Sequence, residues 1–134
     1  MQSMSPTQAK EAPSLALKVN ELRSKQGLVH FALFSSPEGF PTDTAKALKT
    51  GQVPVTEIPV TITLEDLPYG HYAVTLYHDE NSNDKFDTGA LGFPKEGFAF
   101  SNDPKVWKGA PKFHQAEFEF TAENSVVEIT MKYL

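Results

Sequence analysis

The chain has 134 residues, of which 40% are hydrophobic and 22% charged, with a formal net charge of -5. A chain of this length can form one domain with its own core. The acidic balance argues against nucleic-acid binding, which usually needs a basic face, and there is no polybasic segment for an anionic membrane. No cysteine is present, which excludes disulfides, thiolate catalysis and zinc–cysteine sites.

The N-terminal segment, residues 1–13, lacks the apolar centre of a signal peptide, and no run approaches the roughly 18 apolar residues that span a bilayer. We expect it to be a flexible leader, followed by a single domain over residues 14–134. A signal peptide removed earlier would leave no trace in this sequence.

Alternating apolar residues predict strands in the first half of the chain. Residues 15–19 and 28–35 alternate with period two, and the turn residues 23–27 between them favour an antiparallel hairpin. Thr42 or Asp43 could cap a short helix over 45–49 that Gly51 ends.

The second half repeats this pattern around one long irregular stretch. Further strands are expected over 60–64, 71–78, 117–121 and 127–133, and residues 88–111 are expected to be irregular. Six or seven strands without βαβ alternation predict an all-β antiparallel sandwich of transthyretin-like or immunoglobulin-like kind.

The strand over 71–78 runs directly into a loop with oxygen-bearing side chains at every second position. The spacing is that of a calcium-binding loop, in which positions 1, 3, 5 and 9 supply side chains and position 7 a backbone carbonyl. The predicted ligands are Asp79, Asn81, Asn83, the Lys85 carbonyl and Asp87.

The loop departs from an EF-hand at two positions. Position 6 is Asp84 instead of glycine, and position 12 is Ala90, so the usual bidentate glutamate is missing. Water or a distant carboxylate would complete the site, with Glu96 the first candidate and Glu38 the weaker one. The alternative is a solvated turn rich in Asp and Asn, which favour turns through local hydrogen bonds.

Other chemistry has less support. His71 and His78 are expected on opposite faces of one strand, and no Gly-x-Ser-x-Gly elbow or phosphate-binding glycine loop is present. A hydrolase built on the acidic cluster is the weakest alternative. Aromatic side chains in expected loops, namely Trp107, Phe98 and Phe100, could stack on a carbohydrate or dock an apolar ligand, or could simply plug the end of the sandwich.

Several segments together resemble known families. The run Leu67-Pro68-Tyr69-Gly70-His71-Tyr72 resembles the turn and strand of transthyretin-like and Cna-B-like sandwiches. With residues 27–34, 38–41, 78–87 and 92–98, it is similar to a bacterial family of small exported domains, domain of unknown function number 2141. That family usually has glycine where Ser82 and Asp84 stand here.

The resemblance implies a sandwich fold and export to the periplasm or the outside of the cell, and no established activity. Together with the oxygen-rich loop, the resemblance predicts a non-enzymatic domain with a calcium-stabilised loop and a structural or interaction role. The partner, whether a protein or a small molecule, is not predicted.

Overall fold

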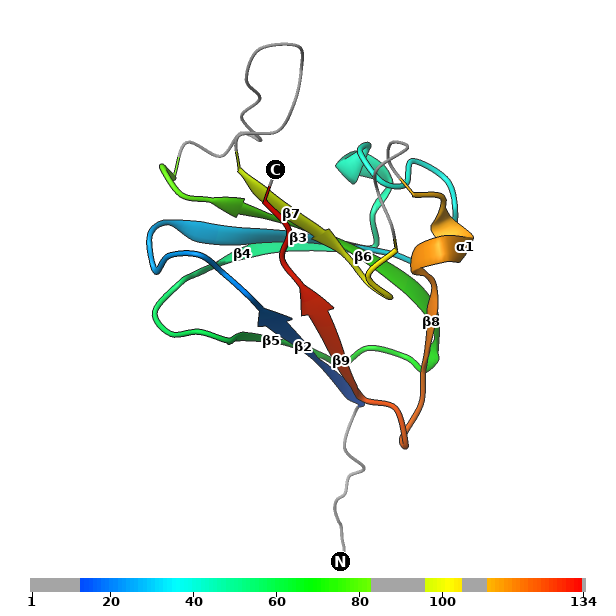
Figure 1. Ribbon diagram of the computed structural model, residues 1–134. Coiled ribbons are helices and arrows are strands. Elements are labelled where there is room, and N and C mark those ends of the chain that lie inside the picture. Colours follow the sequence, from blue (N-terminus) through cyan, green and yellow to red (C-terminus); the bar gives the residue numbers. More distant parts are fainter. Residues whose placement is uncertain (1–12, 83–95, 105–110, 134) are drawn as a thin grey trace, which may run out of the picture.

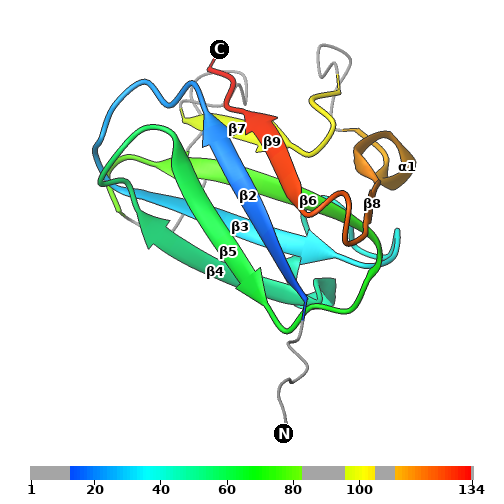
Figure 2. The same cartoon turned by 90° about the horizontal axis from the view of Figure 1, so that it is seen from below.

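The computed structural model describes residues 13–82, 96–104 and 111–133, and shows two β-sheets packed face to face (Figure 1). The view from below shows the smaller sheet lying across the larger one (Figure 2). This confirms the predicted all-β sandwich. In the described ranges, no helix is long and apolar enough to cross a membrane.

The smaller sheet has the strand order β5-β2-β9. Its strands are β2 (Ser14–Asn20), β5 (Val60–Glu65) and β9 (Val126–Thr130). β2 runs antiparallel to β5 and parallel to β9. The parallel pair is the one departure from an antiparallel sandwich among the described strand pairs.

The larger sheet has the order β4-β3-β6-β7, and β8 also pairs with β6. Its strands are β3 (Leu28–Phe34), β4 (Lys49–Pro54), β6 (Gly70–Asp79), β7 (Gly97–Phe100) and β8 (Phe118–Phe120). All of these pairs are antiparallel. β6 is therefore the central strand: β3 pairs with its residues 73–79, β7 with 75–78 and β8 with 70–72.

The main core lies between the two sheets. Alternate residues of a strand point to opposite faces, so each strand sends every second side chain inward. The inward side chains include Leu15, Leu17, Val19, Val29, Leu33, Val60, Ile62, Leu64, Tyr72, Val74, Leu76 and Ile129. This arrangement explains the period-two apolar pattern of the sequence.

A smaller apolar cluster lies on the outer face of the larger sheet, over the end of β3. Phe34 and Ala73 of the sheet contact Phe113 and Ala116 of the short helix α1 (Phe113–Ala116), and Phe40 packs against them from the loop after β3. This cluster fixes one end of the sandwich.

The predicted hairpin between the first two strands is wrong. β2 pairs with β5 and β9, whereas β3 pairs with β4 and β6 in the other sheet. The connection over 21–27 carries Leu22, which is buried in the main core. Because that side chain lies between the layers, the connection crosses from one sheet to the other.

The predicted helix over 45–49 is also largely wrong. Only a 3-10 turn, η1 (Thr44–Lys46), forms, and Asp43 caps it as expected through its Oδ1, which accepts from Ala45 N at 3.2 Å. Gly51 does not end a helix but lies within β4, where its missing Cβ leaves room for the Phe31 ring.

The stretch over 88–111, predicted to be irregular, contains the strand β7. Its Gly97 has no Cβ, and a Cβ there would lie 2.4 Å from the Tyr133 ring. The helix α1 was not predicted either.

Candidate metal-binding site at the end of strand β6

Asp79 ends β6 and is fully buried. It shares the outer face of the sheet with Tyr77, because strand residues two apart point the same way. Its Oδ2 lies 3.0 Å from His30 Nε2. An ionised carboxylate only accepts hydrogen bonds, so His30 donates from Nε2. The His30 ring stacks on Tyr77 with centroids 4.5 Å apart and planes 4° apart, which fixes the direction of this bond.

Glu96 immediately precedes β7 and lies near the end of β6. Tyr77 is opposite Phe98 and His78 opposite Gly97, so continuing this register by one residue places Glu96 opposite Asp79. Glu96 is only 5% exposed, and its Oε2 accepts from the backbone N–H of Glu80 at 3.2 Å. Both carboxyl groups are therefore buried near this end of β6, and Glu96 contacts the backbone of the residue that follows Asp79.

The chain turns sharply after Asp79. Ser82 N donates to the Asp79 carbonyl at 3.2 Å, and Ser82 has a φ of 55°, which is the left-handed region. Asn81 is exposed on this turn. The remaining predicted loop ligands, Asn83, Lys85 and Asp87, lie outside the described residues.

The Glu80 side chain contacts different residues from Asp79. Its carboxylate accepts from Arg23 Nη2 at 2.6 Å and from the Ser24 hydroxyl at 2.8 Å. The hydrogen bond from Arg23 is the main reason that the pKa of Glu80 is lowered, and the Ser24 bond lowers it further against the effect of burial. Glu80 is thus held by the β2–β3 turn and is not placed to bind an ion with Asp79.

His78 anchors the end of β6 on the core side. Its Nε2 lies 2.7 Å from the Gln26 carbonyl and its Nδ1 lies 2.8 Å from the Tyr133 hydroxyl. A carbonyl only accepts, so Nε2 carries the proton and Nδ1 accepts from Tyr133. The Tyr133 oxygen in turn accepts from Arg23 N at 3.0 Å, and burial raises the pKa of Tyr133.

Gly27 packs directly against the start of the turn. Its φ is +74°, and a Cβ at this position would lie 2.0 Å from the Asp79 carbonyl oxygen. The β2–β3 turn and the end of β6 are therefore in backbone contact, and the first residue of the loop is rigidly placed.

Glu38, the weaker candidate for the distant carboxylate, does not lie at this site. The start of β3 is opposite Asp79, with Leu28 as its partner, and Glu38 follows the other end of β3. Its carboxylate lies 3.4 Å from Lys46 Nζ.

Two of the aromatic residues predicted to bind a ligand do not lie in loops. Phe98 and Phe100 lie on β7, not in a loop, and both are half-buried on the outer face of the sheet. Phe100 also packs near Phe40, with centroids 6.3 Å apart. Trp107 is outside the described residues, so ligand binding by these three side chains stays a prediction.

Sequence reasoning did not place His30 at the site. His30 and Asp79 are 49 positions apart, and nothing local distinguishes His30 from any other outward residue of β3. His71 and His78 do lie on opposite faces, one exposed and one buried, as predicted.

The described residues alone do not make a complete metal site, since they contain no group of three or more His, Cys, Asp or Glu side chains placed to hold an ion. What they provide is a rigid base with two buried carboxylates where the predicted loop begins. The protein is therefore an all-β sandwich domain with two buried carboxylates near the end of β6.

A model of a bacterial protein family matches residues 17–128, and the family is described as "Uncharacterized protein conserved in bacteria (DUF2141)". The chain belongs to this family. Comparisons with curated proteins and with solved structures gave no match.

Proposed function

We propose that the loop after β6 binds one calcium ion, and that the ion stabilises a non-enzymatic, exported domain with a structural or interaction role. The observation that carries the proposal is the pair of buried carboxylates, Asp79 at the end of β6 and Glu96 immediately before the adjacent strand β7. Like charges directly opposite each other on neighbouring strands destabilise a sheet. A bound divalent cation would turn that repulsion into attraction.

The number of available oxygens fits calcium, which takes 6–8 oxygen ligands in flexible geometry. Asp79, Asn81 and Glu96 would contribute from the described residues. The sequence adds Asn83, the Lys85 carbonyl and Asp87. Water would fill any remaining position, as it often does in loops of this spacing.

His30 would act on the ion only through Asp79. A ligating carboxylate is usually held by a further hydrogen bond, which fixes its orientation. The bond from His30 Nε2 to Asp79 Oδ2 has this arrangement, and the stacking on Tyr77 keeps the donor in place.

The test is thermal unfolding with and without calcium. Extracellular calcium modules bind with Kd of about 0.1–1 mM. At about 100 times Kd, binding to the native state adds about 2.7 kcal/mol, which corresponds to a rise in Tm of about 8–10 °C for a domain of this size.

Glu96→Gln and Asp79→Asn should each remove most of the calcium-dependent rise. Asn at position 79 can still accept from His30, so the substitution removes the charge and keeps the hydrogen bond. Glu80→Gln is the matched control: it removes a neighbouring carboxylate that Arg23 already holds, and the calcium-dependent rise should persist. The absence of any rise in the unsubstituted protein, with chelator as the baseline, would refute the proposal.

A further inference from the structure

A second candidate site lies at the opposite end of β6, where a pocket of about 670 Å³ opens between the loop after β3 and helix α1. Its volume is within the usual range for small-molecule sites, about 300–1,000 Å³. The two walls come from segments far apart in the sequence, residues 35–40 and 112–117. All of its lining residues are described.

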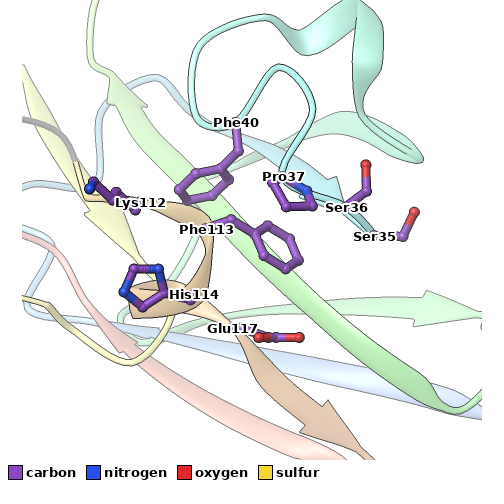
Figure 3. Close-up of a pocket in the computed structure, with 8 residues that line it drawn as sticks. All are labelled: Ser35, Ser36, Pro37, Phe40, Lys112, Phe113, His114 and Glu117. Atoms are coloured by element: carbon purple, nitrogen blue, oxygen red, sulfur yellow. The ribbon is translucent and has the colours of Figure 1, made fainter.

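The floor of the pocket is apolar and aromatic. Figure 3 shows the Phe40, Phe113 and Pro37 rings gathered at its centre. Phe40 meets Phe113 edge to face, with centroids 5.8 Å apart at 89°, and meets Phe34 at 5.3 Å and 84°. These contacts hold Phe40 in one orientation, so the floor exists before any ligand binds.

The wall formed by α1 is fixed to the sheet. The buried Ser101 hydroxyl donates to the Ala116 carbonyl and accepts from Val74 N, and the Asn102 side chain donates to the Glu117 carbonyl. These bonds tie α1 to β6, so this wall of the pocket is held in place by the sheet.

The polar groups lie at two sides of the aromatic floor. Lys112 and His114 are on the α1 side, and the Ser35 and Ser36 hydroxyls are on the other (Figure 3). Within the described ranges, the Lys112 ammonium makes no ion pair, whereas the Glu117 carboxylate lies 3.4 Å from His71 Nδ1. Lys112 is therefore the cation that would meet a ligand, while Glu117 faces a partner of its own.

We propose that this pocket binds a small molecule with a flat ring and an anionic group. The ring would pack on Phe40, Phe113 and Pro37, where aromatic contacts add to the free energy of simple burial. The anion would pair with Lys112, and a polar group at the far end of the ring would reach the serine hydroxyls. This site is independent of calcium binding.

The test uses 4-hydroxyphenylacetate as the probe and 2-(4-hydroxyphenyl)ethanol as its uncharged analogue. Saturation-transfer NMR and calorimetry, both with chelator present, measure binding to the full chain. We expect a Kd of about 1 mM for the charged probe, as is usual for a ligand of this size, and binding at least threefold weaker for the uncharged analogue.

Two variants locate the site. Lys112→Gln should weaken binding of the charged probe about threefold to fivefold, as for an exposed ion pair, and should leave the analogue unchanged. Phe40→Leu should weaken both about tenfold, with thermal unfolding used to confirm that the variant is folded. Lys25→Gln, which removes an exposed lysine from the β2–β3 turn, is the control and should change neither.

Failure of the charged probe to bind at 10 mM would overturn the proposal. So would equal binding of both compounds, or binding that neither Lys112→Gln nor Phe40→Leu reduces.

Discussion

Gly27→Ala tests whether the β2–β3 turn positions the first residue of the loop. A Cβ at Gly27 would lie 2.0 Å from the Asp79 carbonyl oxygen, 2.7 Å from Glu80 Cα and 2.8 Å from the Asp79 carbonyl carbon. All three are backbone atoms, so no side-chain rotation can relieve the clash. Reaching an ordinary contact distance requires the two backbones to separate by about 1 Å or more.

Two costs contribute to the expected loss of stability. Alanine in the left-handed region costs about 1–2 kcal/mol relative to glycine. The separation also strains the bond from Val55 N to the Gly27 carbonyl, 3.1 Å long, and the neighbouring contact between Gln26 and His78, each worth about 1 kcal/mol. We expect a total of about 3 kcal/mol, or a fall in Tm of about 10 °C.

Gly39→Ala is the matched control, because Gly39 has a similar φ of +80° but its Cβ would meet Lys46 at the other end of β3. Both variants should lose stability. Only Gly27→Ala should also reduce the calcium-dependent rise in Tm, because only that substitution displaces Asp79. A Gly27→Ala protein that unfolds within 1 °C of the unsubstituted protein would show that the close packing against Asp79 is wrong.

Two further predictions concern the contacts around each site. The pKa of Glu80 is lowered in the folded protein, chiefly by the hydrogen bond from Arg23. The contribution of ionised Glu80 to stability is therefore complete above the unfolded pKa of about 4.3, and it is lost as the pH falls through the folded pKa. Because Arg23 is half-exposed, Arg23→Met should cost about 0.5–1 kcal/mol of stability at pH 7 and should make stability fall less steeply in acid. Urea unfolding from pH 7 to about pH 3 measures this. Parallel plots of stability against pH for the variant and the unsubstituted protein would contradict it. Ser101→Ala leaves Val74 N and the Ala116 carbonyl without their partner, so it should cost about 2–3 kcal/mol and speed hydrogen exchange in α1; unchanged exchange there would mean that Ser101 does not hold the helix.

The structure also explains which elements were hard to predict. β4 has the sequence Lys-Thr-Gly-Gln-Val-Pro and lies at the edge of its sheet. Edge strands often carry lysine and proline, which discourage further strand pairing. Its apolar alternation is correspondingly weak, so the sequence predicts no strand there and places the end of the expected helix over 45–49 at its start. β7 is short and begins with a glycine that its packing against Tyr133 requires, which makes it look like a loop.

The sequence alone determined the strands with one buried face, such as β2 and β5, because apolar alternation is a local property that follows burial directly. It also determined the oxygen-rich pattern that begins at Asp79. Tertiary structure decided which strands pair, because pairing depends on how the buried faces of distant segments fit together. Only the pairing of β6 with β7 brought Glu96 to the end of β6, and only the pairing of β3 with β6 brought His30 to the Asp79 carboxylate.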